Sequence, residues 1–308
     1  MTEPLLGIIG GSGLYDLPGL ADTAWVEVDT PWGSPSDAVF TGRLPTADGG
    51  SVRLAFLPRH GRGHRIPPGE VNYRANIAAL KQLGATELLS ISAVGSLRAD
   101  LPPGHFVIVD QYIDRTVSRA GSFFGTGLVA HVSMAHPVCA RLGSRVASVL
   151  AAQGVPHVQG GTYVVIEGPQ FSTLAESQLY RSWNASVVGM TNLPEARLAR
   201  EAELCYASVA MVTDYDCWHP DHEAVSVSAV IQVLLGNAAQ ARALVAGVAG
   251  AAAAVGVNGV DPGQAPPAAA CGCRHALDHA LMTAPAARDP AMVERLQGIA
   301  GRVLGAAP

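Results

Sequence analysis

The sequence predicts an α/β domain in which helices enclose a β-sheet. Short apolar runs that end in glycine, proline or aspartate alternate with stretches of helical periodicity along most of the chain, which is typical of this class. Of the 308 residues, 49% are hydrophobic, so the chain can bury a sizeable core. No internal repeat is visible, and single α/β domains of this length are common.

The predicted strands are short apolar runs bounded by turn residues. They comprise residues 5–10, 24–29, 37–44, 51–58, 88–93, 106–110, 163–166, 187–190 and 207–213. The predicted helices comprise residues 70–83, 137–153, 173–183, 194–202 and a segment that begins at residue 227. Residues 258–270 are rich in glycine, proline and alanine. We therefore predict one domain over residues 1–257 and a linker with a helical tail over residues 258–308.

The charge pattern lacks the usual signatures of nucleic-acid and membrane binding. Only 15% of residues are charged and the net charge is −5, with no basic block. The N-terminus has no signal-peptide pattern, and the longest apolar run, residues 243–257, is shorter than the roughly 20 residues that span a bilayer. Five cysteines in a chain of this length do not form a disulfide framework, so we expect a cytoplasmic protein.

A glycine-rich loop, residues 10–13 (GGSG), follows the first predicted strand. Glycines let backbone N–H groups approach an anion closely, and Ser12 adds a hydroxyl donor. A dinucleotide-binding fingerprint requires a third glycine and a following helix, whereas this chain has Asp16 and then a proline. The loop therefore predicts an anion site or a tight turn, and disfavours a dinucleotide site.

A basic loop, residues 58–65 (PRHGRGHR), follows another predicted strand. The guanidinium of Arg59 offers a planar fork of donors that suits phosphate, with His60 beside it. The glycines indicate a loop shaped around a ligand, although a solvated basic loop is the alternative.

Small hydroxyl side chains such as Ser92 end a third strand, in the segment SISAVGS. Ligands gather at the carboxyl ends of strands in open α/β sheets. We therefore expect Ser12, Arg59, His60 and Ser92 to form a cup for one phosphate.

Two aspartates, Asp214 and Asp216, follow the apolar strand of residues 207–213. Residues two apart on a strand point to the same side, so the two carboxyl groups can share a proton or bond one edge of a purine. A carboxyl group near apolar side chains has a raised pKa and can donate a proton. The alternative is a solvated turn in which an aspartate caps the next segment.

An aromatic residue follows a further strand, in the segment IEGPQFS that begins at Ile166. After the strand ends in Glu167, Phe171 can stack on a flat ring. A proline turn with Phe171 as a core residue is equally compatible with the pattern.

The soft metal ligands Cys271, Cys273, His275 and His279 lie close together near the C-terminus. Structural zinc sites usually space their two ligand pairs further apart, so free thiols or a C-x-C disulfide are favoured. A second group, residues 219–223 (HPDHE), is disfavoured because its proline interrupts the helix that such sites need.

Taken together, these segments resemble the methylthioadenosine phosphorylase branch of the trimeric purine-nucleoside phosphorylases, over residues 5 to about 240. The resemblance implies a single domain with a central mixed, partly barrel-like sheet surrounded by helices. The motifs that carry it are GIIGGSGLYD, DTPWGSPSD, LPRHGRGHRIPP, VNYRANIAALK, SAVGSLR, IDRT, IEGPQFSTLAES, GMTNLPEA and ASVAMVTDYDCW.

The resemblance assigns roles to matching residues. Asp214 and Asp216 match the catalytic pair that reads the adenine edge, and Asp214 would protonate N7 of the leaving base. The phosphate-binding positions match Ser12, Arg59, His60, Ser92, Ala93 and Thr191. The nucleoside-binding positions match Phe171, Ser172, Met190, Val227, Val230 and His131.

The implied reaction is phosphorolysis of 5′-methylthioadenosine, or a related 5′-modified 5′-deoxyadenosine, to adenine and the 5-modified ribose 1-phosphate. Inorganic phosphate is the co-substrate, and no metal or organic cofactor is implied. The branch forms homotrimers in which His131 would reach into a neighbouring site, and a short tail helix, through Leu281, would help to cover the 5′ group.

The same residues favour or disfavour each of the alternative functions. A phosphorylase for 5′-halogenated 5′-deoxyadenosine stays open. An inosine or guanosine phosphorylase is disfavoured because that branch has asparagine where this chain has aspartate. The missing third glycine disfavours an NAD-dependent oxidoreductase, and the retained phosphate- and base-binding residues disfavour a non-catalytic nucleotide-binding protein.

Overall fold

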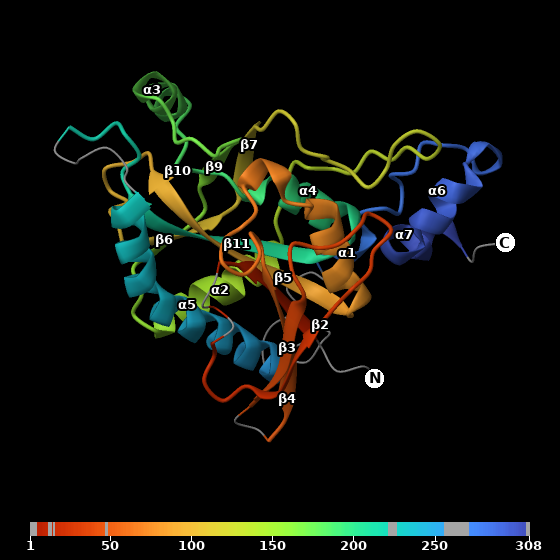
Figure 1. The fold of residues 1–308 in the computed structure, drawn as a ribbon, viewed down its shortest axis with the longest axis horizontal. Coiled ribbons are helices and arrows are strands. Elements are labelled where there is room, and N and C mark those ends of the chain that lie inside the picture. Colours follow the sequence, from red (N-terminus) through yellow and green to blue (C-terminus); the bar gives the residue numbers. More distant parts are fainter. Residues whose placement is uncertain are drawn as a thin grey trace.

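A computed structural model describes residues 5–11, 14, 16–46, 49–220, 227–255 and 271–305, with the side chains of most of residues 227–235 and of 253–255 excepted. These described residues fold around a mixed sheet of eleven strands (Figure 1). No helix in these described ranges combines the length and hydrophobicity that a bilayer-spanning segment requires.

The centre of the sheet is β5 (Ala85–Ser96), which pairs in parallel with β1 (Leu5–Gly10) and with β11 (Cys205–Asp214). β4 (Ser51–Pro58) pairs in parallel with the other side of β1. Because β1, β4, β5 and β11 all run the same way, their carboxyl ends lie at one edge of the sheet.

The sheet forks at the end of β5, where a short antiparallel pairing adds β10. One branch continues through β10, β9 and β7, and the other through β11, β6 and β8, while β2 and β3 extend the side beyond β4. These strands span β2 Ala21–Val26, β3 Val39–Pro45, β6 Phe106–Val109, β7 Gln111–Arg115, β8 His157–Gln159, β9 Thr162–Ile166 and β10 Val187–Gly189.

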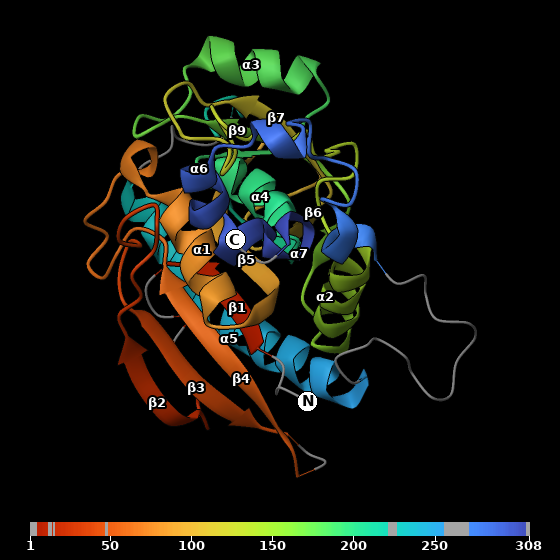
Figure 2. The same ribbon diagram turned by 90° about the vertical axis from the view of Figure 1, so that its right-hand side faces the viewer.

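Helices cover both faces of the sheet (Figures 1 and 2). α2 and α5 pack together on one face, and α1 packs against α4 and α7 on the other. The helices span α1 Tyr73–Gln82, α2 Ala140–Ala152, α3 Leu174–Ser182, α4 Asn192–Glu201, α5 Val227–Val255, α6 Pro290–Arg295 and α7 Gln297–Leu304. Short 3₁₀ turns span η1 Pro68–Glu70, η2 Gly272–His275 and η3 Pro285–Ala287.

The core has one apolar layer on each face of the sheet. In β1, Leu5 and Ile9 pack into the layer under α1 and α4, whereas Leu6 and Ile8 pack into the layer under α2 and α5. Alternate strand residues face opposite sides, so a strand buried on both faces is apolar throughout. The predicted fold class is confirmed, and this double burial explains why β1 could be recognised from a continuous apolar run.

The predicted strand bounds agree with the structure for some strands and not for others. β1 and β4 match their predicted bounds, whereas β2 begins three residues earlier than predicted and β5 and β11 extend beyond the predicted runs. β7 and β8 were not predicted. β7 carries polar residues in the sequence QYIDR, and β8 has only three residues, so neither shows the apolar run on which the prediction relied.

Candidate active site

The carboxyl ends of the parallel strands bring the predicted phosphate residues to one edge of the sheet. Gly10 pairs with Pro58, and the amide of Arg59 donates to the carbonyl of Gly10 at 3.0 Å. On the next strand pair, Ala210 lies opposite Ser92 and Asp214 opposite Gly95. The expected convergence of strand ends is therefore present. Ser12 lies outside the described residues.

Arg59 is buried, with 2% of its surface exposed, whereas residues 62–65 of the same loop are exposed, so the alternative of a solvated loop holds only for the second half of the loop. Its Nε and Nη2 donate to the two carboxylate oxygens of Glu195 at 2.8 and 3.2 Å. Nη1 donates to the carbonyl of Ile91, and Nη2 also donates to the carbonyl of Ile9 and to the Ser90 hydroxyl. Arg59 therefore ties the end of β1 and the middle of β5 to the first turn of α4.

The charge of Arg59 is balanced inside the protein. Burial disfavours the charged guanidinium, but the adjacent carboxylate of Glu195 outweighs burial and raises the pKa of Arg59. Glu195 is fully buried and also accepts a hydrogen bond of 2.8 Å from the hydroxyl of Tyr206. Within the described part of the chain, the second N–H of Nη1 is the donor of Arg59 that has no acceptor.

His60 is neutral at physiological pH. Burial, and then the charge of Arg59, lower the pKa of His60 to about 4. Nδ1 lies 2.9 Å from the carbonyl of Ile66, which can only accept, so we assign the ring proton to Nδ1. Nε2 then has a lone pair, which can accept a hydrogen bond from a protonated phosphate oxygen. The ring of His64 stacks on His60 with centroids 4.3 Å apart.

We expect His60 to make the free energy of unfolding depend on pH. A histidine in the unfolded chain titrates near 6.5, so between that pH and about 4 the unfolded chain binds a proton that the folded chain does not. The stability that neutral His60 confers is fully present above about pH 6.5 and is lost as the pH falls toward 4, by up to roughly 3 kcal/mol.

Urea denaturation of the wild type and of His60→Gln, at about pH 7 and about pH 4.5, measures this contribution. The variant should lose less stability on acidification than the wild type does. Equal losses in the two proteins would contradict the assignment of a buried, neutral His60.

Two buried hydroxyls lie near the same edge. The Ser92 hydroxyl is buried and has no hydrogen-bond partner among the described residues, which is unusual for a buried polar group. Thr191, immediately before α4, is buried, and its hydroxyl lies 3.4 Å from that of Tyr163. Ala93, the neighbour of Ser92, is half-buried. An unpartnered hydroxyl at a strand end suits an anionic ligand that supplies the missing acceptor.

Asp214 and Asp216 lie together at the end of β11. Asp214 accepts hydrogen bonds from the Thr213 hydroxyl at 2.7 Å and from the amide of Asp216 at 2.8 Å. Burial raises the pKa of both carboxyl groups, and the adjacent Asp216 raises that of Asp214 further. A Cβ on Gly95 would lie 2.8 Å from a carboxylate oxygen of Asp214, so glycine is required beside the pair. Asp216 begins a turn, as the alternative held, but this turn is not solvated, because Asp216 is buried and Asp214 is half-buried.

The segment after the pair is held in place by its own contacts. The indole N–H of Trp218 donates to the carbonyl of Ser96 at 2.7 Å, and the guanidinium of Arg181 lies 3.6 Å from the Trp218 ring. The thiol of Cys217 lies 3.4 Å from the carbonyl of Ser172. This last contact joins the aspartate segment to the loop that carries the predicted base-stacking residue.

Phe171 is 45% exposed, so the alternative of a core aromatic is wrong. The hydroxyl of the next residue, Ser172, is buried without a partner in the described part of the chain. An exposed ring beside a buried hydroxyl and the aspartate pair can form one side of a site for a flat heterocycle.

Arg119 joins the segment that carries Met190 to the loop that begins at Glu167. It donates to the carbonyl of Met190 at 2.7 Å and to that of Glu167 at 2.6 Å, and it pairs with the Glu167 carboxylate at 3.3 Å. Gly168 has a φ of +71°, and a Cβ there would lie 2.5 Å from the Met190 sulfur. Glu167 is thus engaged in a structural ion pair, while Met190 stays half-buried at the edge of the site.

Comparisons with known proteins identify the family. A family model described as the phosphorylase superfamily matches residues 5–249. The chain belongs to this superfamily. It is 58% identical to an S-methyl-5'-thioadenosine phosphorylase of Cereibacter sphaeroides, with 98% of this chain and 99% of that one covered. A corresponding enzyme of Rhodospirillum rubrum is 57% identical, with 98% of each covered.

Solved structures of phosphorylases share the fold. A methylthioadenosine phosphorylase from an antarctic soil metagenomic library has a TM-score of 0.85 at 43% identity, with 97% of this chain and 99% of that one covered. The methylthioadenosine phosphorylase of Schistosoma mansoni in complex with adenine has a TM-score of 0.76 at 39% identity, with 81% and 92% covered. This chain is therefore an enzyme of the purine-nucleoside phosphorylase type.

Three predicted residues of this phosphorylase have no described contact with the site residues. Val227 and Val230 belong to α5, but their side chains are outside the described residues. His131 is exposed, and its amide donates to the carbonyl of Ala280 in the tail at 2.8 Å, next to a bridge between Ala130 and Leu281. The tail thus contacts the segment that carries His131.

Sequence reasoning missed three residues that shape the phosphorylase site: Glu195, Gly95 and Arg119. Glu195 lies in the motif GMTNLPEA and Gly95 in SAVGSLR. Both motifs carried the family resemblance, but neither residue was assigned a function. A charged residue at the start of a helix usually faces solvent, and no local pattern reveals that Glu195 is buried against Arg59.

Proposed function

We propose that this phosphorylase cleaves 5′-methylthioadenosine with inorganic phosphate. The bond between C1′ and N9 of adenine breaks, a phosphate oxygen forms a bond to C1′, and the departing base takes up a proton. The observation that carries the proposal is the pair of half-buried Asp214 and buried Asp216, with raised pKa values, at the edge of the sheet near Ser92 and Thr191. The names of the relatives support the choice of nucleoside.

Asp214 is proposed as the proton donor to N7 of the base. A carboxyl group with a raised pKa retains its proton to higher pH, so more of it is available to donate a proton to the developing anion. Asp216 is proposed to accept a hydrogen bond from the 6-amino group. Protonation makes adenine a better leaving group, so the ribosyl carbon develops positive charge as the bond to N9 breaks.

Ser92, Thr191, Ala93 and His60 are proposed to bind phosphate, together with Ser12 of the glycine loop. The buried hydroxyl of Ser92 can donate to a phosphate oxygen, and neutral His60 can accept a hydrogen bond from the protonated oxygen of HPO₄²⁻. Arg59 is proposed to supply positive charge, through its remaining Nη1 N–H, while its other donors hold the strand ends. Bound phosphate then stabilises the cationic sugar and stands ready to attack it.

The carboxylate pair predicts a strong preference for 6-aminopurines. A 6-oxo base places an acceptor against the carboxylate of Asp216, so this carboxylate has no donor to bond. Leaving such a buried group unpaired costs about 10⁴-fold in kcat/KM. We therefore expect kcat/KM for 5′-methylthioadenosine to exceed that for 5′-methylthioinosine by about this factor at saturating phosphate. Steady-state kinetics with both nucleosides measures it, and similar kcat/KM values would contradict the proposed base-binding pair.

We propose a homotrimer in which the exposed His131 reaches into a neighbouring site and the tail residue Leu281 lies near the 5′ group. The bridge between Ala130 and Leu281 supports a shared surface for the two. The proposed reaction uses phosphate as co-substrate and needs no metal or organic cofactor for its chemical steps. A cytoplasmic location is proposed because cysteines free of disulfides suit a reducing compartment.

A further inference from the structure

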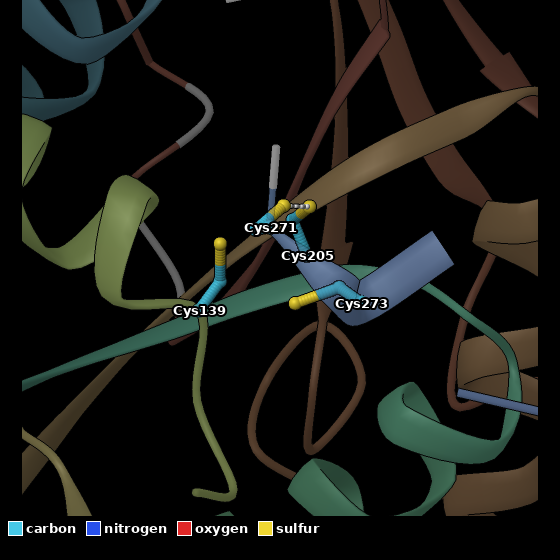
Figure 3. A group of neighbouring side chains, drawn as sticks. All are labelled: Cys139, Cys205, Cys271 and Cys273. Carbon is cyan, nitrogen blue, oxygen red and sulfur yellow. Dashed lines mark hydrogen bonds between the residues drawn. The ribbon is translucent and has the colours of Figure 1, made fainter. Parts of the chain in front are cut away.

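Four cysteines from distant parts of the sequence meet in one cluster (Figure 3). Cys139 immediately precedes α2, Cys205 begins β11, and Cys271 and Cys273 lie at the start of the tail. All four sulfur atoms lie within 4.8 Å of one another. The cluster involves the same C-x-C pair that sequence spacing had placed with His275 and His279. His275 instead lies 3.1 Å from the carboxylate of Asp278.

We propose that this four-cysteine cluster binds one structural Zn²⁺. Structural zinc sites are tetrahedral, and a site of four thiolates has Zn–S distances of about 2.3 Å, which places the sulfurs about 3.8 Å apart. The observed upper limit of 4.8 Å and the 3.3 Å between Cys205 and Cys271 bracket that separation, so small rotations of the side chains complete the tetrahedron. Binding releases the four thiol protons to solvent and leaves a complex with charge −2.

The surroundings suit such a complex. Cys139, Cys205 and Cys273 are buried and Cys271 is partly buried, so the cluster closes around a metal and leaves no open coordination position. Two guanidinium groups approach its sulfurs: Arg141 lies 3.4 Å from Cys205 and Arg200 lies 3.6 Å from Cys273. N–H donors to metal-bound thiolates offset their negative charge and orient them.

The arrangement favours a metal over disulfides. All five cysteines lie in the described residues, and each of them is free. A disulfide joins only two sulfurs, whereas each sulfur here faces three others. Four soft ligands this close together therefore fit one zinc ion better than two separate covalent pairs. Two disulfides in the purified protein are the competing outcome of the test below.

The proposed zinc would attach the tail to the core at a point remote from the chemistry. Cys205 and Asp214 lie at opposite ends of β11, which at roughly 3.3 Å per residue places them about 30 Å apart. The tail makes further contacts, including a 2.7 Å hydrogen bond from the Lys81 ammonium to the carbonyl of Ile299. The metal would add a fixed point where the tail begins, and its role would be structural.

Metal content of the full-length protein tests the proposal directly. Protein produced in zinc-containing medium, without an affinity tag that binds metal, should contain about one zinc per chain by elemental analysis. The fully reduced protein should also bind Co²⁺ and acquire the visible absorption of tetrahedral cobalt thiolate. Cys271→Ser should lose the zinc. Cys217→Ser is the matched control, because Cys217 lies outside the cluster, and it should retain the zinc.

Thermal unfolding separates zinc binding from a simple packing effect of the thiols. Zinc removal should lower the unfolding midpoint of the wild type by more than about 5 °C, and re-addition should restore it, whereas the midpoint of Cys271→Ser should not respond to zinc. Less than about 0.2 zinc per chain in reduced protein, iron in place of zinc, or two disulfides within the cluster by mass spectrometry would overturn the proposal.

Discussion

Asp214→Asn is expected to lower kcat for 5′-methylthioadenosine by about 10²- to 10⁴-fold, because asparagine has no acidic proton to deliver to N7. The amide oxygen can still accept the hydrogen bond from the amide of Asp216, and the side chain keeps its size, so the fold should be preserved. Steady-state kinetics at saturating phosphate, with circular dichroism to check the fold, gives the loss.

Two controls distinguish loss of the proton donor from loss of a negative charge. Asp22→Asn removes an exposed carboxylate on β2 and should leave kcat unchanged. An N7-methylated nucleoside already has a cationic base, so Asp214→Asn should lose much less activity with it. Near-normal turnover of 5′-methylthioadenosine by Asp214→Asn, or an equal loss with the methylated nucleoside, would contradict the role of Asp214.

Arg59→Met is expected to reduce the free energy of unfolding by roughly 3–5 kcal/mol, because it leaves the carboxylate of Glu195 buried without its partner. Methionine also cannot donate to the carbonyls of Ile9, near the end of β1, and Ile91, in the middle of β5. Urea denaturation at about pH 7 measures the change.

A double-mutant cycle assigns the loss to the ion pair. Glu195→Gln in the Arg59→Met background removes the unpaired charge and should recover part of the lost stability. A loss below about 1 kcal/mol in Arg59→Met, or strict additivity of the two substitutions, would show that the pair does not hold these elements together. Because the fold depends on Arg59, a raised KM for phosphate in its variants would not by itself assign it to phosphate binding.

The fold was predictable where burial leaves a strong local pattern. β1 is buried on both faces and reads as a continuous apolar run, so its bounds followed from the sequence. The polar strand β7 pairs with β9 because of the register of the whole sheet, which local periodicity cannot reveal. The fork at β5 depends on a short pairing of Gly95 and Ser96 with β10, and two residues carry too little signal to predict a topology.

The location of the site at the strand ends could be predicted from the sequence, but the contacts between its side chains could not. Arg59 and Ser92 were expected at one edge because parallel strands end together, and they lie there, at the same edge as Asp214, which ends β11. The buried pairing of Arg59 with Glu195 joins residues far apart in the chain, and nothing in either segment alone specifies it. The cysteine cluster was missed for the same reason, since Cys139 and Cys205 gave no local metal-binding spacing.

Incubation of the purified protein with 5′-methylthioadenosine, with and without inorganic phosphate, tests the proposed reaction most directly. Chromatography of the products should show adenine only when phosphate is present, together with an equal amount of 5-methylthioribose 1-phosphate. Adenine released at the same rate without phosphate would indicate hydrolysis and contradict the proposed phosphate site. No adenine in either sample would contradict the proposed substrate.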